Sequence, residues 1–189
     1  AVSLLHAYRE AENERAVATV LRDRLDVPVS VSSEVLAEFR EYERTATTAV
    51  DAYVRPTIDS YLRRLADRAE AAGVPAPRIM QANGGIADSE TVRKRAVQTI
   101  LSGPAGGVVG AKRTAGVAAS RDDLDGLITF DMGGTSSDVS LVRDGTVART
   151  TESEIAGHPI RVPMVDVTTV GSGGGSIAWV DAGGALRVG

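Results

Sequence analysis

The sequence contains no cysteine and only two histidines, His6 and His158, among its 189 residues. The absence of cysteine excludes disulfide frameworks, thiolate metal sites and cysteine nucleophiles, and two histidines are too few for a histidine-rich zinc site. No apolar run approaches the roughly 20 residues that a membrane-spanning helix needs, and residues 1–20 are too charged for a secretory signal. We therefore expect a soluble cytoplasmic protein with no membrane partner.

An excess of basic charge is also absent, because the net charge is −4 and the pI is about 5.3. Nucleic-acid-binding domains carry basic patches and a high pI, so we expect no nucleic-acid partner. Apolar residues make up 43% and charged residues 24% of the chain, values close to the globular average, which argues against disorder. The composition fits one ordinary domain or two small lobes.

Glycine is absent from residues 1–72, whereas all 20 glycines lie between Gly73 and Gly189. We therefore divide the chain into a glycine-free, mainly helical segment (1–72) and a glycine-rich α/β segment (73–189). Proline in a helix removes one backbone donor, so we expect the long helix to kink or restart at Pro56. The spacing of apolar residues and the breakers predict a helix at 7–25, a strand at 29–31 and a long amphipathic helix at 44–72.

The glycine-rich segment alternates short apolar runs with turn signals, which predicts helix and sheet together. Asp144 and Gly145 form a strong hairpin signal, so residues 127–151 are predicted to form three consecutive antiparallel strands. A charged loop is expected at 121–126. Helices are predicted at 89–95 and 102–118, strands at 78–82, 97–101, 127–131, 137–142, 146–151, 161–162 and 165–170, and a last hairpin through 182–184.

Residues 128–141 carry the densest set of chemical signals in the sequence. A buried apolar strand delivers Asp131 to a turn where two glycines let the backbone approach an anion, and hydroxyl groups follow directly. Amides and hydroxyls suit phosphate oxygens, and oxygen ligands suit the magnesium ion that accompanies a nucleotide. On composition alone, a tight hairpin capped by an aspartate explains the segment equally well. The candidate phosphate ligands are Gly133, Gly134, Thr135 and Ser136.

Other glycine-rich or polar positions allow two interpretations each. Residues 171–176 form either a second anion cradle, with Gly173, Gly174 and Gly175 as its ligands, or a sharp turn between strands. The helix start at residues 102–104 offers an anion position, whereas Gly106, Gly107 and Gly110 favour close packing of helix on sheet. Asp138 is interpreted as structural and His158 as a loop residue.

The run Asp131-Met132-Gly133-Gly134-Thr135, followed by Ser137-Asp138-Val139-Ser140, resembles the second phosphate motif of the actin, sugar-kinase and heat-shock-chaperone ATPase superfamily. Three stretches together resemble the hydantoinase A / oxoprolinase family, which includes N-methylhydantoinases. They are residues 32–45, residues 80–85 with 101–107, and residues 131–141 with 171–178. The resemblance implies an α/β, ribonuclease-H-like fold, with a mixed sheet and flanking helices, present here in part.

The resemblance also implies an activity, namely ATP-dependent hydrolysis of a cyclic amide such as a hydantoin or oxoproline. Asp131 would orient the attacking group or hold magnesium, or another divalent cation, through water. Gly133 and Gly134 would donate amides to phosphate, while Thr135 and Ser136 would donate hydroxyls. The implied partner is a hydantoinase B-type subunit. The alternatives are an ATP-using subunit of a ketone carboxylase, or a non-catalytic segment whose residues 1–72 serve as a partner interface.

The sequence departs from the family pattern in length and at three positions, one of which is Ala37, where family members commonly carry proline. Family subunits are several times longer, so we expect an internal fragment that contributes one phosphate clamp to a larger hydantoinase A subunit and is inactive alone. Asn13 and Thr168 stand where family members often carry histidine. If those histidines bind metal or substrate, this chain lacks the ligands. No residue pattern distinguishes a hydantoin, an N-methylhydantoin, oxoproline or a ketone as the substrate.

Overall fold

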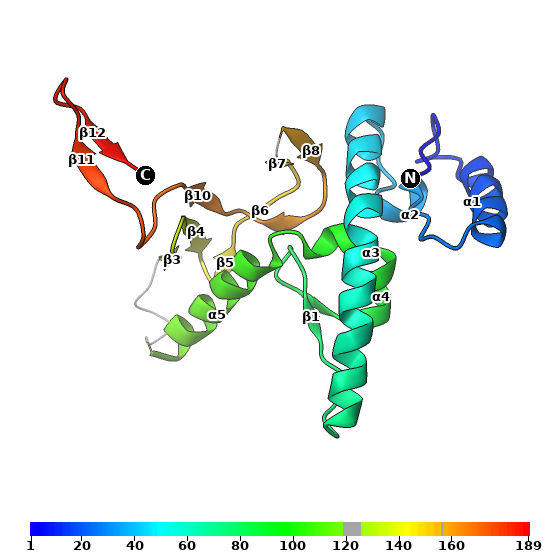
Figure 1. The fold of residues 1–189 in the computed structure, drawn as a ribbon, viewed down its shortest axis with the longest axis horizontal. Helices are drawn as coiled ribbons and strands as arrows, with labels where there is room; N and C mark the ends of the chain where they lie inside the picture. The colour runs from blue at the N-terminus through cyan, green and yellow to red at the C-terminus, as the bar shows by residue number, and fades with distance from the viewer. Residues whose placement is uncertain (119–125, 156) are drawn as a thin grey trace. The chain divides into compact units, whose positions relative to one another are not determined.

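The computed structural model describes residues 1–118, 126–155 and 157–189 (Figure 1). These residues form two compact units. Unit 1 contains residues 1–102 and 150–164, and unit 2 contains residues 103–149 and 165–189. The boundary between the units therefore does not follow glycine content, because residues 73–102 pack with the glycine-free helices. The charged loop expected at 121–126 lies outside the described residues, apart from Gly126.

Unit 1 is built around its longest helix, α3 (Glu41–Ala71), which contacts α2, α4, η1 and β8. Its main apolar core gathers side chains that are distant in sequence, among them Leu36, Val97 and Ile160. No helix in the described parts of the chain is long and apolar enough to cross a bilayer. The other elements of unit 1 are α1 (Glu12–Arg24), α2 (Ser32–Val35), β1 (Ile79–Met80), β2 (Ile86–Ala87), α4 (Ser89–Lys94), the 3-10 helix η1 (Ala96–Thr99), β7 (Ser153–Ile155) and β8 (His158–Ile160).

Helix α3 is continuous and does not restart at Pro56. Pro56 is exposed, so water can hydrate the carbonyl group that loses its donor to the proline ring. The helix ends as predicted at Gly73, which has a φ of +66°. The Gly73 amide donates to the Glu70 carbonyl (2.9 Å), and the Val74 amide donates to the Ala69 carbonyl (3.0 Å). This pair of bonds is the Schellman motif, which satisfies the last carbonyls of a helix.

Three predicted elements of unit 1 are wrong or too long. Helix α1 begins at Glu12 because residues 5–9 form turns. The strand predicted at 29–31 is reduced to a single bridge between Val2 and Val31. The strand predicted at 97–101 is instead η1, where the Val97 amide donates to the Asp51 carboxylate (2.9 Å). Short apolar runs do not separate strand from helix by periodicity, so this tertiary contact decides the conformation.

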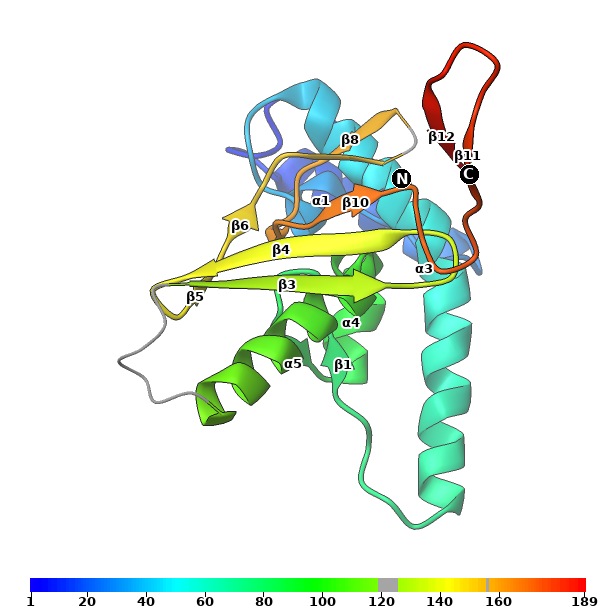
Figure 2. The same cartoon turned by 90° about the vertical axis from the view of Figure 1, so that its left-hand side faces the viewer.

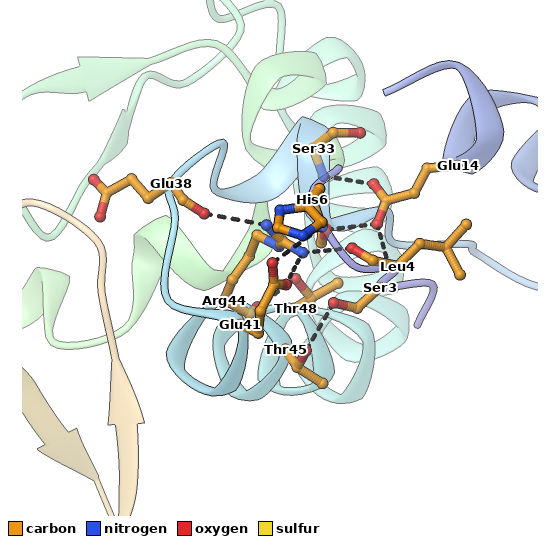
Figure 3. Close-up of polar contacts among 11 residues, drawn as sticks. Ser3, Leu4, His6, Glu14, Ser33, Glu38, Glu41, Arg44, Thr45 and Thr48 are labelled. Atoms are coloured by element: carbon orange, nitrogen blue, oxygen red, sulfur yellow. Dashed lines mark hydrogen bonds and ion pairs between the residues drawn. The ribbon is translucent and has the colours of Figure 1, made fainter. Parts of the chain in front are cut away.

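A buried carboxylate, Glu14 of α1, joins the N-terminal segment to α2 (Figure 3). One of its oxygens accepts from the Leu4 amide (2.8 Å) and the Ser32 hydroxyl (2.6 Å), and the other accepts from the Ser33 amide (2.9 Å). Burial by itself would raise the pKa of Glu14. The hydrogen bonds from Ser32, Leu4 and Ser33 outweigh burial and hold this pKa below its ordinary value.

Arg44 of α3 is also fully buried and lies beside this carboxylate network (Figure 3). Its guanidinium donates to the carbonyls of Leu4 (2.5 Å) and Glu38 (3.2 Å) and forms an ion pair with Glu41. The guanidinium also lies 5.7 Å from the ring centre of Tyr8. Arg44 Nε has no hydrogen-bond partner among the described residues. The side chain thus ties the N-terminal segment and the 36–40 loop to the start of α3.

Unit 2 contains a hairpin of two long strands, β3 (Gly126–Met132) and β4 (Ser137–Arg143), flanked by β10 (Thr168–Val170) on β4 (Figure 2). Asp144 and Gly145 both have positive φ, of 48° and 67°, as the type I′ hairpin turn requires. The three consecutive antiparallel strands predicted within 127–151 are confirmed as β3, β4 and β5. The remaining elements are α5 (Ser102–Ala118), β5 (Thr146–Val147), β11 (Ala178–Val180) and β12 (Leu186–Val188), with β6 (Arg149–Thr150) paired to β9 (Met164–Val165).

The sheets differ from the predicted mixed sheet, because the strand pairs with a described register are antiparallel. Short turns connect consecutive strands, and parallel pairing would need long crossovers. The strand predicted at 146–151 is divided into β5 and β6, and residues 161–162 lie between strands. The run 165–170 is interrupted because the Asp166 amide donates to the Ala148 carbonyl (2.9 Å). The fold class is nevertheless α/β, as predicted.

The two faces of the β3–β4 hairpin differ in what covers them. Ala105 and Val108 of α5 pack against Val142 on one face, with Leu127 at the edge of this small core. On the other face, alternation along the strands exposes large apolar side chains. These are Ile128, Phe130, Met132 and Leu141, with exposed fractions between 38% and 69%.

Candidate functional site

The turn at residues 133–136 joins β3 to β4 and is closed by one backbone hydrogen bond. The Gly133 amide donates to the Ser136 carbonyl (2.8 Å). The amides of the next three residues, Gly134, Thr135 and Ser136, donate no hydrogen bond to any described residue, and neither do the hydroxyls of Thr135 and Ser136. Five donors within three residues are therefore free to bind an anion. Consecutive free amides in a turn are a recurring phosphate-binding arrangement in proteins.

Two carboxylates face each other at the end of the hairpin beside this turn. In the register of the two strands, Asp131 lies directly opposite Asp138. Directly opposed residues of antiparallel strands project to the same face with Cβ atoms about 5 Å apart. Asp131 is exposed, whereas Asp138 is half-buried and accepts a hydrogen bond from the Thr169 hydroxyl of β10 (2.6 Å). Two carboxylates this close would repel each other, and a divalent cation held beside them would offset that repulsion.

A cavity of about 230 Å³ adjoins the two carboxylates in unit 2. Residues from the first three turns of α5 form one wall, and the hairpin forms the other. Gly107 of α5 faces Asp131, because a Cβ atom at Gly107 would lie 3.6 Å from the carboxylate oxygen Oδ2. The lining residues are Pro104, Gly107, Val108 and Ala111 of α5 with Thr129, Phe130, Asp131 and Asp138 of the hairpin.

The loop at residues 172–176 lies directly against the 133–136 turn. The Gly174 amide donates to the Gly133 carbonyl (2.9 Å), and the Gly175 amide donates to the Gly134 carbonyl (2.8 Å). The Gly173 amide donates to the Ser176 hydroxyl within the loop (3.0 Å). All three glycine amides that the sequence offered as a second cradle are therefore already engaged in protein hydrogen bonds. The structure gathers both glycine stretches at one place, but the amides of Gly173, Gly174 and Gly175 are engaged, whereas those of residues 134–136 have no partner among the described residues.

The sequence interpretation missed two members of this site, Asp138 and Gly107. The sequence could have identified Asp138, because a tight hairpin with its turn at residues 133–136 places position 138 directly opposite position 131. A Cβ atom at Gly107 would make an ordinary contact with Asp131, whereas one at Gly110 would meet nothing within 4 Å. His158 lies exposed in β8 rather than in a loop.

Asn83, within one of the stretches that carry the family resemblance, belongs to unit 1. Asn83 and its neighbouring glycines form the turn between β1 and β2, with the Gly85 amide donating to the Asn83 side chain (2.7 Å). Asn13 and Thr168 are exposed, and they belong to different units. Within the described ranges, no group of three or more His, Cys, Asp or Glu side chains is placed to hold a metal. A pair of carboxylates suits magnesium, which keeps several waters and commonly takes one or two carboxylates together with substrate phosphates.

The hydantoinase/oxoprolinase family model matches residues 44–189 of the chain. The chain belongs to this family. It is 39% identical over 191 residues to the caprolactamase subunit alpha of Pseudomonas jessenii, a match that covers 100% of this chain and 27% of that protein. It is 37% identical over 190 residues to the 5-oxoprolinase of Saccharomyces cerevisiae, covering 100% of this chain and 14% of that protein.

Two solved structures of family members share the fold over nearly the whole chain. The crystal structure of ATP-dependent caprolactamase from Pseudomonas jessenii has a TM-score of 0.81 and 38% identity, covering 100% of this chain and 27% of that one. A nucleotide-free structure of acetone carboxylase has a TM-score of 0.77 and 29% identity, covering 99% and 26%. The family assignment expected from the motifs is thus confirmed, and the chain spans between 14% and 27% of these relatives' lengths.

Proposed function

We propose that this segment supplies one phosphate clamp of an ATP-dependent hydrolase that opens a cyclic amide. The observation that carries the proposal is the 133–136 turn, whose three consecutive free amides lie beside the opposed carboxylates of Asp131 and Asp138. The relatives named for an activity on cyclic amides, caprolactamase and 5-oxoprolinase, support the reaction class. Phosphorylation of the amide oxygen would make the resonance-stabilised C–N bond cleavable by water.

The carboxylates assign a role to a divalent cation. Two negative side chains would repel the phosphates of ATP, and a magnesium ion held by Asp131 and Asp138 would supply the positive charge that offsets this repulsion. Asp131, which is exposed toward the cavity, would hold the ion through water or orient the attacking group. Asp138, held by Thr169, would take a second water of the same ion. The free amides of the turn and the hydroxyls of Thr135 and Ser136 would bind the terminal phosphoryl oxygens, where fixed donors stabilise developing charge.

We further propose that the clamp belongs to a ribonuclease-H-like fold of the actin, sugar-kinase and heat-shock ATPase type. The run of three antiparallel strands with the phosphate turn between the first two supports this assignment. In such a protein the rest of the polypeptide would cover the exposed apolar face of the hairpin and provide the opposing clamp. A single clamp preorganises nucleotide from one side only, so the segment alone would turn over ATP poorly.

The partner would be a hydantoinase B-type subunit, and ATP use favours a cytoplasmic location and a role in hydantoin or lactam utilisation. Chain coverage supports the partner assignment. The same region makes up 27% of caprolactamase subunit alpha but 14% of yeast 5-oxoprolinase, so the latter is about twice as long. Caprolactamase subunit alpha would then need a partner chain to supply the part that 5-oxoprolinase carries in the same polypeptide.

The test replaces Asp131 with asparagine in the complete polypeptide that carries this segment. ATP turnover with a panel of 5-oxoproline, hydantoin, caprolactam and acetone is expected to fall by about two orders of magnitude or more, because the variant keeps the size of the side chain and loses its charge. The matched control is Asp144→Asn at the opposite end of β4, where asparagine tolerates the positive φ.

Equal activity of the two variants would contradict the role assigned to Asp131. If the wild-type protein turns over ATP with acetone but not with the cyclic amides, the ketone-carboxylase alternative would replace the proposed hydrolase activity. Nucleotide affinity and melting temperature are measured on the same samples, so that a loss of turnover is separated from a loss of folded protein.

A further inference from the structure

We propose that the 172–176 loop is a brace that aims the free amides of the 133–136 turn, with Gly173 as its positioning residue. The loop would then act on phosphate through the turn and not through its own amides. The effect on nucleotide rests on the proposed function, whereas the effect on the conformation of the turn does not.

The direction of two free amides follows from peptide geometry. A trans peptide is planar, so the carbonyl of one residue and the amide of the next point in opposite directions. The Gly133 carbonyl is held by the Gly174 amide (2.9 Å), which turns the Gly134 amide away from the brace. The Gly134 carbonyl is held by the Gly175 amide (2.8 Å), which turns the Thr135 amide away in the same manner. Two bonds from the brace therefore fix two of the three free amides.

The contact requires glycine at its closest point. A Cβ atom at position 173 would lie 2.6 Å from the Gly133 carbonyl oxygen and 2.8 Å from the Ser136 nitrogen. These neighbours are backbone atoms, so the two segments must separate if a side chain is present. A Cβ atom at position 175 would lie 2.9 Å from the Gly134 oxygen, and one at position 174 would lie 3.8 Å from the Gly133 oxygen, an ordinary contact. The predicted order of damage by alanine is therefore 173, then 175, then 174.

A third bond ties the brace to the start of β4. The Ser137 hydroxyl donates to the Ser172 carbonyl (2.6 Å), and Ser137 is the first residue after the turn. The brace therefore holds both the leading and the trailing side of the 133–136 turn. Preorganised donors cost no reorganisation when charge develops, so a brace of this kind raises phosphate affinity without contacting phosphate.

The experiment measures amide hydrogen exchange by NMR in the complete polypeptide that carries this segment and in its Gly173→Ala, Gly175→Ala and Gly171→Ala variants. The reporter is the Gly133 amide, which is bonded to the Ser136 carbonyl and lies outside the brace. We expect Gly173→Ala to accelerate its exchange by roughly tenfold or more, and Gly175→Ala to do so less strongly. Gly171→Ala is the matched control, because a Cβ atom there meets nothing within 4 Å. Exchange at Gly133 that is unchanged in Gly173→Ala would overturn the brace.

A titration of the same samples with ATP and magnesium separates this inference from the proposed function. In the wild-type chain, ATP is expected to shift and protect the amides of residues 134–136, and Gly173→Ala is expected to weaken binding by about tenfold. ATP that instead acts first on the amides of residues 173–175 would show them to be direct ligands and overturn the brace. A wild-type chain whose turn ignores ATP, but whose Gly133 amide responds to Gly173→Ala, would contradict the proposed function and retain the brace.

Discussion

Unit 1 joins segments that are distant in sequence mainly through side chains, whereas unit 2 joins them mainly through the backbone. In unit 1 the connections are made by side chains, because Glu14, Arg44 and Asp51 are fully buried and each bonds to a segment far away in sequence. In unit 2 the 172–176 loop and the 133–136 turn meet through backbone atoms alone at their closest point. The chemical donors of the candidate site are likewise mainly backbone amides.

This difference predicts that substitutions in the two units will affect different properties of the protein. A buried charged side chain leaves an uncompensated partner when it is removed, so substitutions in unit 1 should act on unfolding. A backbone amide cannot be deleted by substitution and can only be moved, so substitutions in unit 2 should act on geometry and on ligand binding. Three predictions, in order of decreasing effect, test whether the units divide in this way.

The largest loss of stability is expected for Arg44→Leu. The variant removes the donors of the Leu4 and Glu38 carbonyls and an ion pair whose Glu41 side chain is 36% exposed, and each buried carbonyl left without a donor costs about 1–3 kcal/mol. The control is Arg22→Leu, whose ion pair with Glu34 (2.7 Å) is 43% exposed on the arginine side and is worth about 0–1 kcal/mol. Urea unfolding followed by circular dichroism measures both, and equal losses would remove the distinction between buried and exposed pairs.

An intermediate effect is expected for Glu14→Gln, and it should depend on pH. The hydrogen bonds that lower the pKa of Glu14 favour the ionised form in the folded protein, so the unfolded state binds more protons and stability rises with pH. The contribution is present above the ordinary pKa of 4.5 and is lost as the pH falls through the lower folded-state value. The glutamine amide group would place an N–H donor against the groups that now donate to Glu14, so the variant should lose about 1–3 kcal/mol of unfolding free energy at pH 7.

The measurement is the free energy of unfolding of wild type and variant at pH 7 and at about pH 3, which lies below the ordinary pKa of 4.5 at which the unfolded state takes up its proton. The difference between the two proteins should shrink at the lower pH. Glu12→Gln, on the exposed side of the same helix, serves as control and should change neither value. A difference for Glu14→Gln that stays constant with pH would mean that the carboxylate charge does not stabilise unit 1.

The smallest effect on stability is expected at glycines with open space around them, where only the backbone φ angle decides the cost of a side chain. Gly73 has a φ of +66° and open space around its Cα, so Gly73→Ala should destabilise the end of α3 by about 1 kcal/mol. Gly110 lies inside α5 with open space and no positive φ, so Gly110→Ala should stabilise by about 0.5–1 kcal/mol. Thermal unfolding distinguishes the opposite signs. A change in melting temperature of the same sign in both variants would show that backbone conformation does not determine the effect of alanine at these two positions.

The sequence alone predicted the elements whose causes are local. The helix stop at Gly73, the turn at Asp144 and Gly145, and helix α5 all follow from residues within a few positions of each other, and each is confirmed. The sequence also placed Asp131 and residues 133–136 on one strand and its turn, and their motifs identified the family. Pattern and turn chemistry suffice where neighbouring residues set the conformation.

Only the tertiary structure decided the features that depend on residues far apart in the chain. The apolar run at 97–101 became η1 because Asp51 bonds to the Val97 amide across 46 positions. The two glycine stretches looked alike in sequence, but contact between them engages the amides of Gly174 and Gly175, whereas the amides of residues 134–136 have no partner among the described residues. Which amides are free depends on which carbonyls come within hydrogen-bonding distance, and a sequence specifies its donors and acceptors without specifying their distances.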